Sequence, residues 1–215
     1  MVNEIEVWGI GTPRCMRVHW MLEELGLDFK IHPIRSRTGE ANTEEYRRLN
    51  PREKIPTLVH GSFALTESAA IVTYLGDSFS VPDAFFVPKT VKEIALVDEW
   101  NYMIMTELDA TSLYIIRRHE SLKHLYCPSP EVVESAKEYF SKQIEAMKSA
   151  ANLKGSYLCG DKCSSADIMM ITTLDWALKC GINLSEEWNL YRDRVIMRAA
   201  YKRAFEINYP DGMKV

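Results

Sequence analysis

The sequence of 215 residues predicts an α/β domain with a mixed sheet, followed by an all-helical domain. Three observations carry this prediction. A strand–helix–strand pattern of about 30 residues opens the chain, which is the length of a parallel βαβ unit. A hairpin signal and another helix follow it, whereas from about residue 85 onward the periodic segments have helical spacing. We therefore expect the chain to change from mixed α/β to all-α at that point.

The first domain is expected to have the element order β-α-β-α-β-β-α. Its first strand covers residues 4–10, which alternate and are rich in Ile, Val and Trp. Pro13 suits the first turn of the helix that follows, and Gly26 suits its end. The remaining elements are a strand at 29–34, a short helix at 43–49, hairpin strands at 57–60 and 63–65, and a helix at 66–79.

A linker is expected at residues 81–88, because prolines punctuate a stretch that has no periodicity. The predicted domains are therefore residues 1–80 and residues 89–215. Ser164 and Asp167 have the spacing of a capping box, which we interpret as a folding element of the second domain. The helical patterns of that domain lie at 89–119, 131–150, 164–179 and 185–205.

The composition argues against several classes of protein. The formal net charge is -4, which gives no reason to expect the basic patch of a nucleic-acid-binding protein. No apolar run approaches the roughly 18 residues of a membrane span, and the first residues lack the pattern of a signal peptide. The expected location is the cytoplasm. Five cysteines, an odd number, do not indicate a disulfide framework, and their spacing does not indicate a metal site.

Two short segments carry the most specific signal. Ile55-Pro56 stands at the start of a predicted strand, and Glu67-Ser68 opens a predicted helix. Taken alone, each has a structural explanation, because sheets tolerate a proline at a strand start and helices favour polar residues in their first turn. Together and in this order they resemble the cytosolic glutathione transferase superfamily, in its theta-like or bacterial-type form. The resemblance also covers residues 22–27 and 50–51, and in the second domain Gly160 and residues 164–167.

The resemblance implies a thioredoxin-like fold for the first domain, with a glutathione site built on it. A cis-proline loop at Ile55-Pro56 would expose the backbone of Ile55, which pairs with the cysteinyl part of glutathione like an added strand. The helix that opens at Glu67-Ser68 would receive the γ-glutamyl end, with the Ser68 hydroxyl donating to the carboxylate and Glu67 holding the ammonium group. The weaker contacts expected are Arg14 and Lys54.

The activating position falls on Thr12 by the same resemblance, where members usually carry Tyr, Ser or Cys. Threonine has the required O–H donor, and its extra methyl group restricts χ1. The implied activity is conjugation of glutathione to small apolar electrophiles in detoxification, with peroxide reduction beside it. Two alternatives stay open: Cys15 could support thiol transfer or dehydroascorbate-type reduction, or the fold could serve as an inactive scaffold.

The resemblance places the electrophile pocket between the first loop and the long helix that opens the second domain. Polar residues that break the apolar pattern of that helix are its better candidates. The expected pocket residues are Tyr102, Met103, Thr106 and Glu107. Members of the superfamily are usually homodimers that take glutathione as co-substrate, and the same is expected of this chain, without a metal.

Overall fold

The computed structural model describes residues 4–151 and 153–213, and its elements confirm the expected fold class. The chain forms two compact units. The first runs to residue 87 and takes in the chain again from residue 197, and the second is residues 88–196. We expected the chain beyond residue 196 to belong with the helical domain, but its contacts lie in the first unit.

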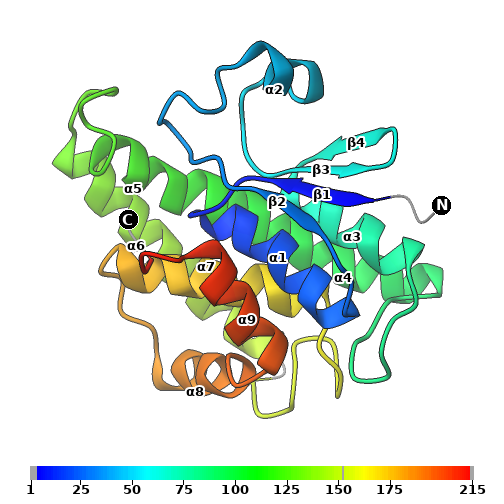
Figure 1. The fold of residues 1–215 in the computed structure, drawn as a ribbon. Coiled ribbons are helices and arrows are strands. Elements are labelled where there is room, and N and C mark those ends of the chain that lie inside the picture. Colours follow the sequence, from blue (N-terminus) through cyan, green and yellow to red (C-terminus); the bar gives the residue numbers. More distant parts are fainter. Residues whose placement is uncertain (1–3, 152, 214–215) are drawn as a thin grey trace. The chain divides into compact units, whose positions relative to one another are not determined.

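A four-stranded sheet forms the centre of the first unit (Figure 1). β1 is parallel to β2 and antiparallel to β3, and β3 pairs with β4 in an antiparallel hairpin. The sheet is therefore mixed, as a strand–helix–strand unit followed by a hairpin predicts. The strands are β1 Ile5–Trp8, β2 Lys30–His32, β3 Thr57–His60 and β4 Phe63–Thr66, in the order β2-β1-β3-β4.

Helices lie on both faces of this sheet. α1 (Pro13–Leu25) and α3 (Ser68–Ser78) pack together on one side, and α2 (Glu44–Leu49) lies on the other (Figure 1). The alternation along β1 explains the two layers, because neighbouring side chains of a strand point to opposite faces. Val7 is fully buried, and the next residue, Trp8, packs against a separate cluster that includes α2.

α1 begins and ends where the sequence predicts. The Thr12 side chain caps its N-terminus by accepting a hydrogen bond from the Cys15 N–H, and Gly26 ends it in a left-handed conformation with φ of 63°. The strand before it ends sooner than expected. Gly9 and Gly11 have φ values of 124° and 78°, and such values interrupt a strand.

α9 (Ala199–Asn208) packs along α1, which explains why the chain returns to the first unit. Arg198 donates to both carboxylate oxygens of Glu24 at 2.6 Å. The ring of Tyr201 meets that of Trp20 edge-on, with 5.0 Å between the centroids. An aromatic contact and a bidentate ion pair of this kind fix one helix against the other.

The second unit is all-helical in the described residues, as expected. Its longest helical stretch continues from α4 through the π-helical η1 into α5. α7 lies in the interior, because most of its side chains are buried. The elements are α4 Val91–Met103, η1 Ile104–Leu113, α5 Tyr114–His119, α6 Pro130–Ala146, η2 Met147–Ser149, α7 Ser165–Lys179 and α8 Glu186–Val195.

The capping box predicted from the sequence is present at the start of α7. Asp167 is fully buried and accepts hydrogen bonds from the N–H groups of Ser164 and Leu158, both at 2.9 Å, and from the Tyr191 hydroxyl at 2.7 Å. A buried carboxylate is tolerated only when donors of this kind surround it. The pair is therefore part of the core of the second unit.

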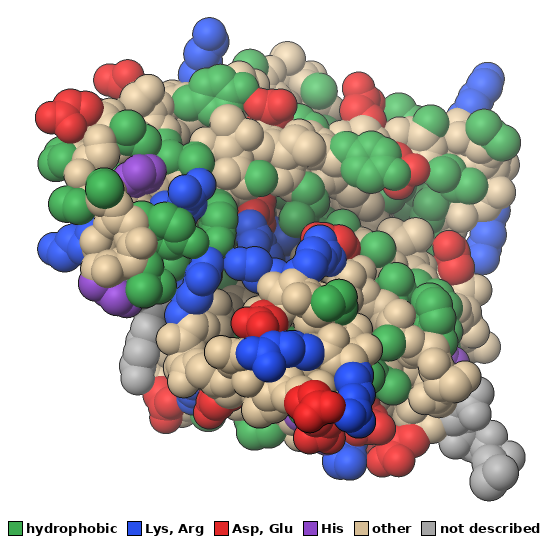
Figure 2. Space-filling model, turned by 90° about the horizontal axis from the view of Figure 1, so that it is seen from above, with side chains coloured by type: hydrophobic (Ala, Val, Ile, Leu, Met, Phe, Trp, Pro, Cys, Tyr) green, Lys and Arg blue, Asp and Glu red, His purple; other side chains and the backbone are tan. Residues whose placement is uncertain are grey.

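Charges of both signs are interspersed on the face shown in Figure 2. This agrees with a sequence of 26 basic and 30 acidic residues. Among the residues that the structure describes, none of the helices has the length and apolarity that a membrane span requires. Within the same ranges, no three His, Cys, Asp or Glu side chains gather in a way that could hold a metal ion.

One histidine of α1 lies in the interior, where no hydrogen bond within the described residues replaces the water that its ring has lost. His19 is fully buried, and in the described part of the chain neither ring nitrogen has a hydrogen-bond partner. Its ring stacks near that of Phe29, with centroids 6.0 Å apart. Burial lowers the pKa of His19 to about 4, because the protonated imidazole would lose its hydration.

We therefore expect the free energy of unfolding to fall as the pH drops from about 7 to about 4. The unfolded chain takes up a proton at His19 near pH 6.5, whereas the folded protein does so only near pH 4, so the loss is on the order of 3 kcal/mol. Urea unfolding at several pH values measures it. His19→Leu should flatten this dependence, and His124→Leu, at an exposed histidine, should not. Identical pH dependence in His19→Leu and the unchanged protein would contradict the expectation.

Candidate active site

The predicted glutathione-binding segments of the first unit meet at one end of the sheet. Trp8 of β1 is opposite Thr57 of β3, and Thr57 is opposite Thr66 of β4. Both pairings are antiparallel, so the residues after β1, before β3 and after β4 come to the same end of the sheet. The sequence expectation treated these segments as parts of one site, and the register brings them together.

Thr12 stands where β1 gives way to α1, and its hydrogen bonds fix its orientation. The side-chain Oγ1 accepts from the Cys15 N–H at 3.1 Å, and the backbone carbonyl accepts from the Met16 N–H at 3.0 Å. Thr12 as a whole is 8% exposed. Accepting from an amide occupies a lone pair of the hydroxyl and leaves its proton available to a further acceptor.

The Ile55–Pro56 peptide bond is cis, as the resemblance implied. The loop that contains it lies very close to the end of β1. A Cβ atom added at Gly9 would come within 2.7 Å of the Ile55 Cβ and 2.9 Å of the Cys15 Sγ, so only glycine fits there. The absence of a side chain at this position lets the proline loop and the start of α1 approach each other.

A buried tyrosine supports the proline loop from below. The Tyr46 hydroxyl donates to the Lys54 carbonyl at 2.5 Å and lies 2.8 Å from the Thr57 Oγ1. The Asn50 side chain donates to the same carbonyl at 2.7 Å. Burial raises the pKa of Tyr46, so its hydroxyl keeps its proton. The carbonyl before Ile55 is thus held on the inner side of the loop.

Ser68 opens α3 above a buried positive charge. Its Oγ accepts from the Nη1 of Arg17 at 3.2 Å, and the side chains of both residues are almost completely buried. The side chain of the N-cap residue Glu67 makes no capping hydrogen bond, so it leaves the first N–H groups of α3 to other acceptors. An uncapped helix start, a hydroxyl and a guanidinium together favour an anion at this point.

Glu67 precedes Ser68 in a strained conformation. Its φ of 69° lies in the left-handed region, which is uncommon for a residue with a side chain and is typical of ligand-binding positions. The carboxylate pairs with the Nη1 of Arg52 at 2.8 Å, and Arg52 also donates to the Thr66 hydroxyl at 2.9 Å. Glu67 therefore stands beside the start of α3 as a negative group paired with Arg52.

The other expected residues of the first unit differ in exposure. Lys54 is exposed and Arg14 is half-buried. Cys15 is completely buried. An attacking thiol has to be accessible, so this burial does not favour disulfide chemistry at Cys15.

The expected pocket residues of the second unit lie where α4 continues into η1. Tyr102 is 64% exposed, and the Thr106 hydroxyl donates to its carbonyl at 2.9 Å, one turn away. Met103 is half-buried. Glu107 accepts a short hydrogen bond from the Tyr139 hydroxyl of α6. The segment thus presents an aromatic ring, a hydroxyl and a carboxylate on neighbouring turns.

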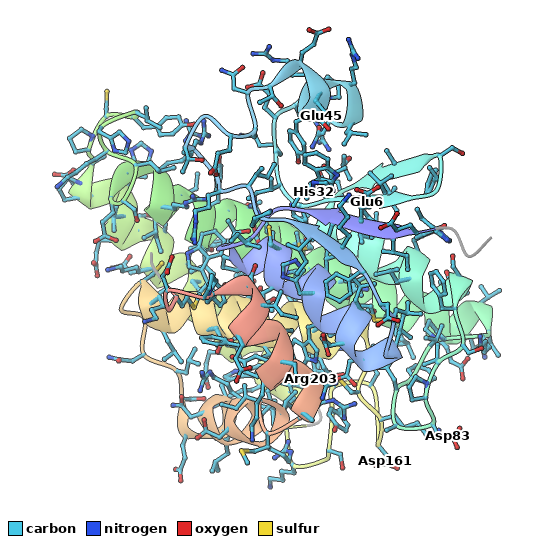
Figure 3. The ribbon with its side chains drawn as sticks, viewed as in Figure 1. Glu6, His32, Glu45, Asp83, Asp161 and Arg203 are labelled. Carbon is cyan, nitrogen blue, oxygen red and sulfur yellow. The ribbon has the colours of Figure 1, made fainter. Side chains whose placement is uncertain are left out.

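A second polar pair lies on the face of the sheet beneath α2. Figure 3 shows Glu6 and His32 side by side there, and their side chains are 2.5 Å apart. His32 also stacks on Trp8, with ring centroids 3.7 Å apart. The hydrogen bond from His32 lowers the pKa of Glu6. The pair binds β2 to β1, and His32 lies at the same end of the sheet as Trp8 and Thr57.

Sequence reasoning missed three residues that shape the site, namely Arg17, Tyr46 and Asn208. Asn208, the last residue of α9, donates a hydrogen bond to the Thr12 carbonyl in the loop of residues 9–12, called the Thr12 loop below. For Arg17 the available signal was a charged residue within the buried helix that starts at Pro13. A pattern in the sequence does not indicate the contacts of Tyr46 and Asn208, because these depend on how distant segments pack.

Sequence profiles of known domains match both parts of the chain. The profile described as "Glutathione S-transferase, N-terminal domain" matches residues 12–78, and "Glutathione S-transferase, C-terminal domain" matches residues 103–193. The chain is also similar to glutathione S-transferase theta-1 of Mus musculus. The two are 25% identical over 177 residues, which is 81% of this chain and 72% of the mouse protein.

Solved structures share the fold. Human glutathione-S-transferase T1-1 matches with a TM-score of 0.83 at 22% identity, over 96% of this chain and 88% of that chain. The theta class glutathione S-transferase from Xanthomonas axonopodis pv. citri, with glutathione bound, matches with a TM-score of 0.79 at 23% identity, over 94% and 97%.

The fold and the site together define a class of protein: a thioredoxin-like domain with a cis-proline loop, joined to an all-helical domain. Both domain profiles and the relatives agree with this class. The chain belongs to the cytosolic glutathione transferase superfamily.

Replacing Tyr46 by Phe should loosen the proline loop without opening a cavity. The change removes one hydroxyl and leaves the Lys54 carbonyl with the Asn50 donor alone, which should cost about 1–2 kcal/mol of stability. Amide hydrogen exchange should accelerate at Ile55 and Thr57. Tyr74→Phe is the matched control, because it removes a hydroxyl bonded to His60 at the other end of β3. Equal exchange at Ile55 and Thr57 in Tyr46→Phe and in the unchanged protein would show that the hydroxyl does not hold the loop.

Proposed function

We propose that the protein is a glutathione transferase that uses the Thr12 hydroxyl to activate the glutathione thiol and conjugates it to small apolar electrophiles. One observation carries the proposal. The loop of residues 9–12, the cis-proline loop and the helix start at Glu67-Ser68 all lie at the same end of the sheet. These features match the parts of one tripeptide: a thiol, a main chain and a zwitterionic γ-glutamyl end.

The γ-glutamyl end would bind at the start of α3. Its carboxylate accepts from the Ser68 hydroxyl and from the open N–H groups of the helix, with the Arg17 charge behind them. Its ammonium group pairs with Glu67. The Glu67 carboxylate already pairs with Arg52, so it would divide its charge between Arg52 and the ammonium group of glutathione. The contact with the ammonium group is therefore moderate in strength.

The cysteinyl part would bind along the backbone of Ile55, in the manner of an added strand. Support from below by Tyr46 and Asn50 keeps the loop carbonyls in place before glutathione arrives, which lowers the entropic cost of binding. Arg14 and Lys54 would add contacts at the edge of the ligand. This pose directs the glutathione sulfur toward Thr12.

Activation of the thiol requires a moderate free energy. A free thiol has a pKa of about 8.5, and lowering it by roughly two units needs about 2.7 kcal/mol in favour of the thiolate. A charge-assisted hydrogen bond from the Thr12 hydroxyl supplies about 1.5–3 kcal/mol. The N-terminus of α1, which begins beside Thr12, adds to this.

In the reaction, the thiol proton leaves to water and the sulfur forms a bond to an electrophilic carbon. A halide or similar group departs with the bonding electrons, or an unsaturated carbonyl compound takes up a proton at its α-carbon. The same thiolate would reduce a peroxide, with a second glutathione completing the disulfide. Tyr102, Met103, Thr106 and Glu107 are the residues proposed to line the electrophile pocket.

We further propose a cytoplasmic homodimer, as is usual in the superfamily. Exposed apolar side chains along α4 support an assembly, since large hydrophobic residues are seldom left open in such number on one helix. Val91 is 84% exposed, Leu96 58% and Ile94 44%.

The first experiment is titration calorimetry with glutathione, followed by conjugation assays with aryl halides, alkyl halides and unsaturated carbonyl compounds. We expect binding with a dissociation constant below the millimolar range and turnover of at least one class. Binding without turnover of any class would favour the scaffold alternative. No heat at millimolar glutathione would contradict the proposed function.

Thr12→Val should lower kcat about a hundredfold and leave KM for glutathione nearly unchanged, because the hydroxyl acts on the thiolate and the tripeptide is held elsewhere. Thr12→Ser should retain most of the activity. The valine also removes the cap of α1, at a cost of about 0.5–2 kcal/mol. Thr90→Val removes a comparable cap from α4 and controls for that loss. Full activity of Thr12→Val would exclude Thr12 as the activating residue.

A further inference from the structure

From the contacts of α9 with the Thr12 loop, we infer that Asn208 is a positioning residue that holds the Thr12 hydroxyl in place for thiol activation. The inference rests on the proposed function of Thr12. Asn208 is fully buried, and its amide bonds to both neighbouring peptide units of the loop. The Oδ1 accepts from the Gly11 N–H at 3.1 Å, and the Nδ2 donates to the Thr12 carbonyl at 3.0 Å.

The loop needs such support because of its sequence. Gly11 has a φ of 78°, so the residue that directly precedes Thr12 lies in a region that glycine enters and leaves freely. A catalytic group has to be held within about 0.5 Å of its working position, and a displacement of 1 Å can reduce the rate about a hundredfold. The asparagine amide fixes the peptide units on either side of the Gly11–Thr12 junction.

Asparagine is suited to this place, because its amide offers an acceptor and a donor side by side. The Gly11 N–H also bonds to the backbone carbonyl of Asn208 at 2.8 Å, so it keeps a partner when the side chain is shortened. The Thr12 carbonyl has its other bond to the Met16 N–H within α1. Loss of the amide would therefore release the loop while leaving the helix and the glutathione-binding residues intact.

α9 lies against α1 and ends at Asn208. Arg198 and Arg203 of the segment pair with Glu24 and Glu23 of α1. Beyond the helix, Asp211 pairs with Arg35 at 2.8 Å. A Cβ at Gly11 would lie 3.2 Å from the Arg35 Nη1, so this guanidinium sits directly over the loop. Asn208 thus binds the loop from one side. Arg35, which pairs with Asp211 beyond the end of α9, covers it from another.

The test compares Asn208→Ala with Arg198→Gln. The second variant breaks the bidentate pair with Glu24 and weakens the packing of α9 without touching Thr12. For each, the ultraviolet absorbance of the bound glutathione thiolate is titrated against pH, and kcat and KM for glutathione are measured. Thermal unfolding shows how much of each protein is folded under the conditions used.

In Asn208→Ala we expect the apparent pKa of the bound thiol to rise by about one unit and kcat near pH 6.5 to fall about tenfold, with recovery at higher pH. KM for glutathione should change less than about twofold, since the tripeptide is held at other residues. In Arg198→Gln the thiol pKa should match the unchanged protein, even where the melting temperature is lower.

A thiol pKa in Asn208→Ala equal to that of the unchanged protein would overturn the positioning role. An equal rise in Arg198→Gln would overturn it as well, because it would trace the effect to the packing of α9 as a whole. These results would leave the proposed function standing. Absence of a thiolate signal in the unchanged protein, in contrast, would refute the proposed function and the role of Asn208 together.

Discussion

The proposed function requires the hydroxyl of Thr12 to cap a helix and serve a ligand at once, and much of the first unit follows from that constraint. Because Oγ1 accepts from the Cys15 N–H, the side chain is held in one orientation. A hydroxyl with a fixed acceptor bond can turn its proton only in the remaining directions. The β-branched side chain narrows the choice further, since it restricts rotation about χ1. Threonine can therefore present a single, directed donor at the end of β1.

Ser68, at the start of α3, has a hydroxyl that is held in a similar way. Its oxygen accepts from the buried Arg17, as that of Thr12 accepts from a buried amide. In both cases the interior of the protein supplies the donor, which leaves the hydroxyl proton available to a further acceptor. Polar groups of this kind cost little to keep in place, because their inner hydrogen bonds are satisfied before any ligand is present. The two hydroxyls are thus held by inner hydrogen bonds of the protein itself.

The elements that sequence reasoning predicted correctly are those with local signals. Pro13 and Gly26 delimit α1, the Ser164–Asp167 pair caps α7, and the proline at position 56 stands at the start of β3 in the cis form. Each depends on residues that are at most a few positions apart. The two halves of the glutathione site were joined by resemblance, and the hairpin register accounts for their proximity.

What the sequence could not predict depends on contacts between distant segments. Asn208 and Gly11 are 197 positions apart, and a periodic apolar pattern in α9 does not specify which helix it will cover. The π-helical turns of η1 were also unforeseen, because their apolar spacing differs little from that of an ordinary helix. The stacking of His32 on Trp8 could not be predicted either, because it joins two separate strands, β2 and β1.

The return of α9 to the first unit has a consequence for biosynthesis. Chains emerge from the ribosome N-terminus first, and domains generally fold as they are made. Here the surface of α1 that includes Trp20 stays uncovered until the whole helical unit has been translated and α9 follows it. The nascent protein therefore carries an incomplete first domain for much of its synthesis, and the loop at Thr12 gains its last support only after Asn208 has left the exit tunnel.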